Sequence, residues 1–133
     1  MITFIFYFES GIQAQKATAP AQPITKLKNA YENVFLVGAA VNNDIVSGVD
    51  KLSQDIVINQ FNSITAENVM KAALINPQPG VYNYEPADAF VAFGKKHNMF
   101  IIGHTLVWHN QVPTWFFTNA DGKSNTKEEQ IER

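Results

Sequence analysis

The sequence feature that most constrains the fold is an apolar run that leads into a cluster of polar and aromatic residues. Residues 99–106 are largely apolar, and the overlapping segment GHTLVWHNQ at 103–111 contains two His, one Trp, one Asn and one Gln. A continuous apolar run of this length is typical of a strand in a parallel sheet. Since ligands bind at the carboxyl ends of such strands, the segment predicts a strand that delivers binding side chains to one edge of a sheet.

Two other segments have the same pattern, and helical segments separate them. Apolar runs at 34–41 and 61–65 predict two more strands, the first buried on both faces and followed by a loop at 42–44. Helical spacing or capping signatures predict helices at 24–31, 51–59 and 87–97, and another that opens at Thr126. For the helix at 51–59, Asp50 and Ser53 are the candidate N-caps, and Leu52, Ile56 and Asn59 or Gln60 share one face. The alternation predicts an α/β fold of about three β/α units, the third incomplete. Because three parallel strands leave two open edges, we expect the N-terminal part of a larger α/β domain.

Composition excludes several classes of function. A formal net charge of −2 over 133 residues gives no electrostatic footprint for nucleic acid, and no basic amphipathic helix indicates binding to a membrane surface. The absence of cysteine excludes disulfides and thiolate metal sites. His104 and His109 are five residues apart with no acidic ligand beside them, so no metal site is expected. No cofactor is expected either.

The N-terminus is different in character from the rest of the chain. Residues 2–8 form a short apolar run, followed by small residues that resemble the cleavage region of a signal peptide, although the positive n-region is missing. The run is too short for a transmembrane helix. We expect residues 1–19 to be a signal peptide and leader, and the protein to be secreted or periplasmic. The alternative is that this run is a first strand of the domain.

Three polar residues follow the second predicted strand. Glu67, Asn68 and Lys71 offer a carboxylate, an amide and an ammonium, which together provide the donors and acceptors that a hydroxyl-rich ligand such as a sugar needs. The alternative is structural: if 67–74 is helical, Glu67 and Lys71 form an i,i+4 pair on its surface.

A second group of candidates surrounds the third predicted strand. His104 and Trp108 would share one face of that strand by its period of two, and Gln111 follows three residues later. An indole stacks on apolar sugar faces while hydroxyl edges take hydrogen bonds, so the group favours a sugar platform. His109 is assigned a supporting role, and Trp115 is a candidate for lining the same cleft. The alternative for Trp108, taken alone, is a core residue.

Residues that could catalyse a reaction on a bound sugar are harder to identify. Glycoside hydrolysis requires two carboxylates, about 5 Å apart in retaining enzymes. Glu67 is a candidate for one of them, but the other acidic residues lie at predicted helix starts, on helix faces or in turns, where capping explains them. The residues alone therefore predict sugar binding without locating a catalytic pair.

The motif ITAENVMK at 64–71 is followed by the motif GHTLVWHNQVPTW at 103–115, with a spacer at 77–88 between them and the GAA of residues 38–40 before them. In this order, and with this spacer, the motifs resemble glycoside hydrolase family 10, the endo-β-1,4-xylanases. The resemblance covers 27–133. It implies a (β/α)8 TIM barrel, of which residues 20–133 would be a truncated catalytic domain.

The resemblance also implies roles for individual residues. Those expected to bind xylose units on the glycone side of the cleft are Glu67, Asn68, Lys71, His104, Trp108 and Gln111. The acid/base and the nucleophile of the family are glutamates at the ends of the fourth and seventh strands, so the resemblance places both beyond Arg133 and no catalytic residue in this chain. We expect the parent to be a retaining endo-1,4-β-xylanase acting on xylan or xylo-oligosaccharides, and the chain alone to be inactive. The alternative is a non-catalytic xylan-binding fragment or a truncated, inactive gene product.

Overall fold

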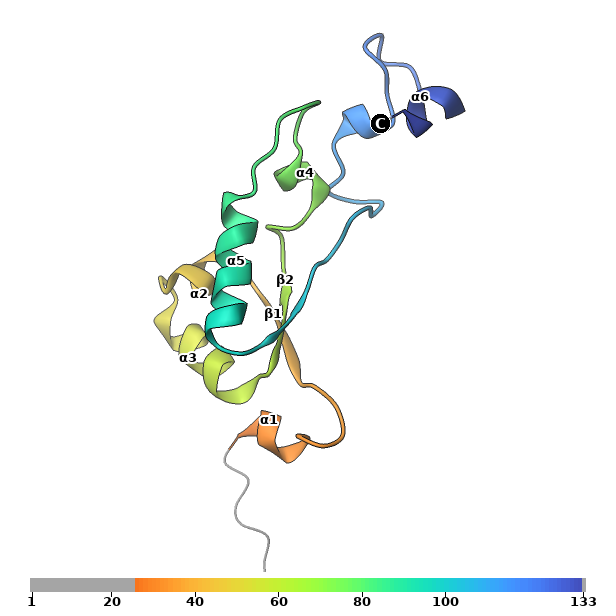
Figure 1. Ribbon diagram of the computed structural model, residues 1–133. Coiled ribbons are helices and arrows are strands. Elements are labelled where there is room, and N and C mark those ends of the chain that lie inside the picture. The colour runs from red at the N-terminus through yellow and green to blue at the C-terminus, as the bar shows by residue number, and fades with distance from the viewer. Residues whose placement is uncertain (1–25, 133) are drawn as a thin grey trace, which may run out of the picture.

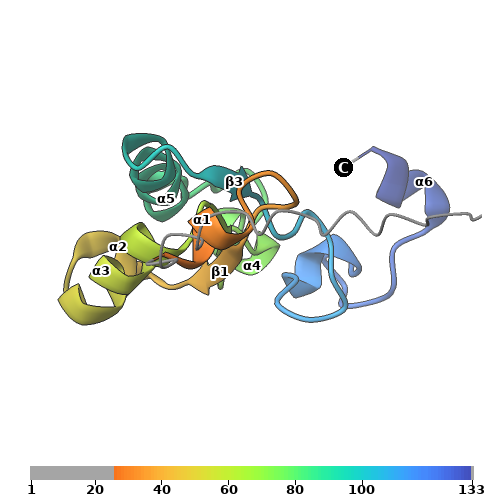
Figure 2. The ribbon, with the colours of Figure 1, turned by 90° about the horizontal axis from the view of Figure 1, so that it is seen from below.

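The computed structural model describes residues 26–132 of the protein. The predicted signal peptide and leader at 1–19 lie outside the described residues. In chain order the elements are α1 (Leu27–Ala30), β1 (Gly38–Val41), α2 (Asn43–Ser47), α3 (Lys51–Gln60), β2 (Ser63–Ala66), α4 (Ala72–Ile75), α5 (Glu85–Lys96), β3 (Phe100–Ile102), the 3₁₀ helix η1 (Thr114–Phe116) and α6 (Lys127–Ile131). Figure 1 labels most of them, and Figure 2 labels β3.

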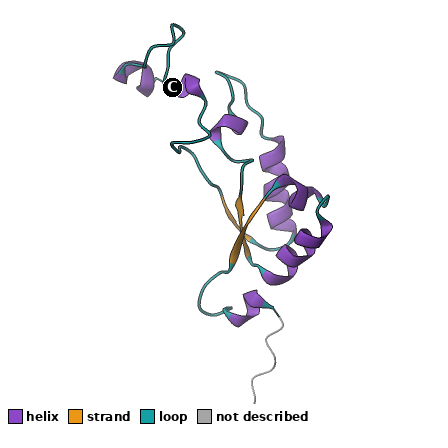
Figure 3. Ribbon diagram, turned by 180° about the vertical axis from the view of Figure 1, so that it is seen from behind, coloured by secondary structure: helices purple, strands orange, loops and turns teal. Residues whose placement is uncertain are grey.

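The strands form a three-stranded parallel sheet in the order β1-β2-β3. Helices α2, α3 and α5 gather on one side of this sheet, as the view from behind shows (Figure 3). The segments that leave the carboxyl ends of β2 and β3 run away from the end of the sheet where α1 lies (Figure 1). The predicted α/β arrangement of parallel β/α units is confirmed. None of the helices within 26–132 is long and apolar enough to cross a membrane.

The core lies between the central strand and α5. Ile64 on β2 and Phe90 on α5 are completely buried, and Val41 at the end of β1 is nearly so. Helix α5 forms here because Pro86 lies in its first turn, where the missing N–H has no helical partner to lose. Its acidic residues lie in the first turn and its lysines in the last, which complements the helix dipole. The helix therefore begins at Glu85, two residues before the predicted start.

A glycine sets how closely α5 approaches the sheet. A Cβ at Gly94 would lie 2.6 Å from Cγ1 of Ile101 on β3 and 3.1 Å from Cδ1 of Ile64 on β2. Real Cβ atoms do not come so close to another carbon, so only glycine allows this helix–strand distance. Packing rather than backbone conformation requires the glycine here.

The predicted outer strands are shorter and less buried than expected. In the run 34–41 only Gly38–Val41 is a strand, and in the run 99–106 only Phe100–Ile102 is. Both are limited by the four residues of β2, because a strand exists only where a neighbour completes its hydrogen bonds. Only Val41 of β1 is buried, so the prediction of a strand buried on both faces is wrong for β1. It fits the central strand β2, three of whose four residues are buried.

Two other local predictions need correction. Residues 42–44 do not form a loop, because the Asn42 side chain accepts a hydrogen bond from the Ile45 N–H and caps α2. Asp50 caps α3 as predicted. However, α3 buries Val57, whereas the predicted apolar face, Leu52 and Ile56, is exposed.

Candidate functional site

The loops that follow β2 and β3 meet beyond the carboxyl ends of their strands. The loop after β2, residues 67–71, is called the β2 loop here, and the loop after β3, residues 103–113, the β3 loop. The backbone N–H of Ala73, in the first turn of α4, donates to the carbonyl of Gln111 at 3.0 Å and joins the two segments. The sequence therefore brings its two polar clusters together, as the parallel sheet predicts.

Lys71 lies at the centre of the site. Its side chain is only 4 % exposed, although it carries a charge. The Nζ atom contacts Nδ1 of His104 and lies 5.0 Å from the centroid of the Trp108 ring, a cation–π arrangement. An ammonium can only donate, so Nδ1 accepts and the imidazole proton sits on Nε2. These contacts with the β3 loop offset the cost of burying the ammonium.

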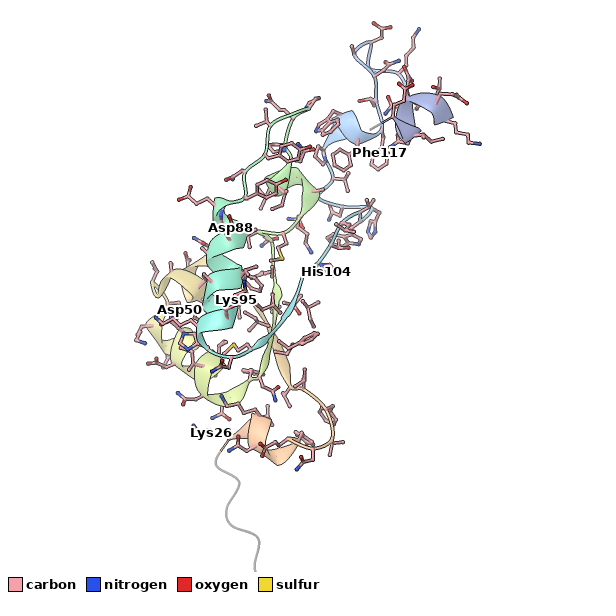
Figure 4. All side chains as sticks on the ribbon, in the orientation of Figure 1. Lys26, Asp50, Asp88, Lys95, His104 and Phe117 are labelled. Atoms are coloured by element: carbon pink, nitrogen blue, oxygen red, sulfur yellow. The ribbon has the colours of Figure 1, made fainter. Side chains whose placement is uncertain are left out.

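His104 and Trp108 come together for a reason that differs from the predicted one. They do not share a strand face, because β3 ends at Ile102, and Leu106 between them is 93 % exposed. His104 lies on the segment that leads from β3 toward η1 (Figure 4). Its ring contacts the Trp108 ring edge-on at 6.2 Å between centroids. The pair is set by the loop and by Lys71 between them, and Trp108 is not a core residue.

Asn68 and Gln111 connect the two loops directly. The Nε2 atom of Gln111 donates to Oδ1 of Asn68 at 2.9 Å. Gln111 has a φ of 52°, a left-handed conformation that is uncommon outside glycine. Its own N–H donates to Oδ1 of Asn110, the local bond that helps to support this conformation. Both predicted binding residues therefore lie at the contact between the loops.

Glu67 is also at this edge, but it does not pair with Lys71. The segment 67–71 is not helical, so the i,i+4 surface pair does not form, and Lys51–Asp55 is the ion pair found within 26–132. The Glu67 N–H instead donates to the carbonyl of Val41 and extends the contact between β1 and β2 by one residue. Its side chain is exposed beside Asn68.

The two supporting residues have different surroundings. His109 is exposed, and its ring meets Trp108 at 4.9 Å between centroids. Trp115 lies on η1, where Nε1 donates to the carbonyl of Asn76 at 3.2 Å and its ring packs on Phe116. Trp115 therefore connects η1 to the end of α4.

Asn76 is a residue that sequence reasoning missed. It is buried, and its Nδ2 donates to the carbonyls of Gln78 and Val81, which closes the turn after α4. Its backbone carbonyl accepts the hydrogen bond from the indole N–H of Trp115. An Asn directly before a Pro, in the sequence NPQPG, is the signal that could have indicated this role.

The same edge carries a small pocket of about 240 Å³. It is lined by Asn42, Asn43, Asp44, Asn68 and Val69. No group of three or more His, Cys, Asp or Glu within the described part of the chain could hold a metal ion. The site as a whole is an array of fixed donors and acceptors beside an indole, which suits hydrogen bonding to a neutral, hydroxyl-rich ligand.

Comparison with known proteins gives consistent matches. Residues 26–133 match the model of the family described as glycosyl hydrolase family 10. The chain is 37 % identical over 123 residues to endo-1,4-beta-xylanase A of Xylanibacter ruminicola, covering 92 % of this chain and 33 % of the relative. It is 39 % identical over 118 residues to endo-1,4-beta-xylanase A of Halalkalibacterium halodurans, covering 86 % and 29 %.

Solved structures agree. The crystal structure of an endo-1,4-beta-xylanase from Caldicellulosiruptor owensensis superimposes with a TM-score of 0.72 at 39 % identity, covering 81 % of this chain and 32 % of that one. A mutant structure in complex with xylotriose has a TM-score of 0.72 at 43 % identity, covering 80 % and 31 %. The chain thus spans about a third of the length of these relatives.

The comparisons also place the open sheet. Its three parallel strands and their helices are the N-terminal part of the (β/α)8 barrel of these relatives, as the resemblance implied. The family match and the structural matches lead to one assignment, and the chain belongs to glycosyl hydrolase family 10.

Proposed function

We propose that this chain forms the glycone-side sugar-binding surface of a secreted, retaining endo-1,4-β-xylanase. In this proposal residues 1–19 are the signal peptide and leader, and 20–133 belong to the catalytic domain. The binding residues are Glu67, Asn68, Lys71, His104, Trp108 and Gln111, with His109 and Trp115 in support. The observation that carries the proposal is the junction of the two loops at Lys71, where a buried ammonium is held between an imidazole and an indole.

The hydrogen bonds within the site leave groups available for sugar hydroxyls. Lys71 has three N–H donors, of which His104 takes one. The Nε2–H of His104 and the amide oxygen of Gln111 are further groups that these contacts do not use. The apolar face of a xylose ring can stack on Trp108 while its hydroxyls meet these groups. The edge thus offers both donors and acceptors, which sugar hydroxyls require.

Hydrolysis requires more than this surface provides. A retaining mechanism needs an acid/base and a nucleophile about 5 Å apart. In the proposal these two glutamates come from the fourth and seventh strands of the barrel, outside this sequence. The role of the present residues is to bind and orient the sugar units on one side of the scissile bond.

Titration of the purified 133-residue chain with xylotriose tests the binding half of the proposal. Binding should be saturable and should perturb the amide signals of the β2 and β3 loops, and Lys71→Met should weaken it strongly. Maltotriose, with α-linkages, serves as the sugar control. Equal affinity for both trisaccharides, or unchanged binding by Lys71→Met, would argue against this surface.

A second assay separates binding from hydrolysis. The purified chain is incubated with xylan, and reducing ends are measured. We expect none above the background of heat-treated protein, because the catalytic pair is assigned elsewhere. Reducing sugar released by the chain alone would overturn that assignment, whereas binding without release is also what the alternative, a non-catalytic xylan-binding fragment, requires. Expression of the complete gene then distinguishes these two, since only a full enzyme releases xylo-oligosaccharides.

A further inference from the structure

The outer helices enclose a second concave site, away from the two loops. A groove of about 610 Å³ lies between α3 and α5, with α2 at one end. Seen from below, α5 lies on one side and the α2–α3 pair on the other (Figure 2). Two small residues, Ala89 and Ala92, line the α5 side and leave the groove open. The residues that line this groove all lie between positions 43 and 97.

The rim of this groove is basic. Lys51 of α3, Lys96 of α5 and His97 at the end of α5 all line it. Burial lowers the pKa of His97, and the positive charges of Lys96, Lys28 and Lys51 lower this pKa further. Three lysines from three helices therefore raise the positive potential at one imidazole, although the chain as a whole has a net charge of −2.

Hydrogen bonds hold two of these lysines in place. Lys28 donates from Nζ to the carbonyl of Ile58, a residue that lines the groove, at 2.8 Å. Lys51 is paired with Asp55 at 2.6 Å and also donates to Gln54. Asp55 offsets the charge of Lys51 in part, so Lys96 and His97 on the opposite wall are the cationic and donor groups most available to a ligand.

The floor of the groove is apolar, which limits the kinds of anion that fit. Val46, Ile58 and Phe93 line it, and the His97 ring packs against Phe93 at 4.8 Å between centroids. Asn43 and Ser47 add polar groups at the α2 end. A simple inorganic anion would contact the cationic groups at the rim and leave the apolar side chains of the floor exposed to solvent. A ring with an apolar face, hydroxyls and one carboxylate would use all three parts.

We propose that this groove binds the carboxylate of an acidic sugar, such as a uronic acid substituent on a polysaccharide chain. The anion preference follows from the groove alone, whereas the choice of a sugar rests on the proposed function. The groove would hold a decorated chain on the outer surface of the fold, separate from the surface built around Lys71. Asn43 also lines the small pocket beside the β2 loop, but none of the residues assigned to the glycone site lines the groove.

Titration of the isotope-labelled chain with sodium glucuronate tests the proposal. Saturable shifts should appear at the amides of 43–58 and 89–97, and glucose at the same concentrations should give none. The affinity for glucuronate should fall as salt is raised, because the groups are exposed to solvent. Sulfate is the third arm: if it binds as well as glucuronate, the groove is a general anion site and the proposal of an acidic sugar is overturned. Equal binding of glucose overturns the anion preference.

Variants identify the groups involved. Lys96→Ala should weaken glucuronate binding by about threefold to tenfold, the effect of losing one solvent-exposed, charge-assisted contact. Lys95→Ala is the matched control, because Lys95 is also exposed and adjacent but does not line the groove. An equal loss in both variants would indicate diffuse attraction and not this groove. Xylotriose titration of the same samples should be unchanged, so failure here is distinguishable from failure of the glycone site.

Discussion

The β2 loop and the β3 loop carry the same kind of residues but are supported in different ways. The β2 loop follows the most buried strand, and its Lys71 is buried and bonded through its N–H to the carbonyl of Asn68. The β3 loop follows a three-residue edge strand and exposes Leu106 almost completely. Its principal contacts run to the β2 loop, through His104 and Gln111, and to the start of α4, where the Ala73 N–H donates to the carbonyl of Gln111.

This difference indicates an order of dependence within the site. The scaffold of β2 and α5 fixes the β2 loop, and the β2 loop in turn positions the β3 loop. A defect in the scaffold should therefore affect both loops, whereas a defect at their junction should release the β3 loop alone. The following experiments separate these levels.

The largest effect is expected in the scaffold. Phe90→Ala removes a completely buried ring from the core beneath β2 and should lower the free energy of unfolding by about 3–5 kcal/mol. Leu106→Ala, in the exposed β3 loop, should change it by less than about 0.5 kcal/mol. Urea unfolding followed by tryptophan fluorescence measures both. Similar losses in the two variants would remove the distinction between the loops.

The junction of the loops comes next. Lys71→Met keeps most of the apolar stem but leaves Nδ1 of His104 without its donor. Because a charged hydrogen bond contributes about 1.5–3 kcal/mol, xylotriose should bind about tenfold or more weakly. Lys95→Met, on the exposed side of α5, is the matched control and should bind as the parent chain does. Binding by calorimetry checks this, and retention of affinity in Lys71→Met would contradict the central role of this lysine.

A smaller effect is expected at Gln111. Gln111→Ala removes the bond to Asn68 but leaves the Gln111 carbonyl bonded to the Ala73 N–H. The loss of one neutral hydrogen bond, about 1 kcal/mol, should weaken xylotriose binding by about fivefold. Amide hydrogen exchange should become faster at 103–113 and stay unchanged at 67–71. Faster exchange in both loops would show that the β2 loop depends on the β3 loop, contrary to the proposed order.

The smallest effect concerns pH and lies outside both loops. Burial and the nearby lysines hold the pKa of His97 below its ordinary value of 6.5, so the unfolded chain takes up this proton at a higher pH than the folded chain. Stability should therefore be complete above pH 6.5 and fall as the pH drops below it. His97→Gln should remove this slope above about pH 5, where carboxylates begin to contribute. Urea midpoints at several pH values test it, and a flat profile in the parent chain would contradict the assignment.

The sequence was sufficient for much of the fold because the signals were local. The structure contains the features whose signals depend on neighbours in sequence. These are the capping residues Asp50 and Thr126, the helical pattern of α5 and the order of the β/α units. Strand length was not predictable, because the extent of β1 and β3 is set by pairing with the short β2. The apolar run at 34–41 contains nothing that marks Gly38 as the first paired residue.

In the candidate site, too, some features were predictable from the sequence and others were not. That the two polar clusters would meet followed from the parallel sheet, but the arrangement of His104 and Trp108 did not follow from the period of a strand. It depends on Lys71, which is 33 residues away from His104 in the chain. The role of Asn76 was missed for a similar reason, since its partner Trp115 lies 39 residues away. Contacts over such separations leave no periodic trace in the sequence.

The absent side chain of Gly94 links the packing of the helix layer to the position of the β3 loop. Gly94 packs against Ile101, which lies three residues before His104. A methyl group at this position would meet Ile101 of β3 at 2.6 Å and Ile64 of β2 at 3.1 Å, so we expect β3 and the base of the β3 loop to shift more than β2 does. We therefore expect the position of His104 relative to Lys71 to depend on a residue of the helix layer that lies outside the proposed sugar site. Gly94→Ala is in this sense a remote affinity variant, whose effect on sugar binding should exceed what its effect on stability alone would suggest.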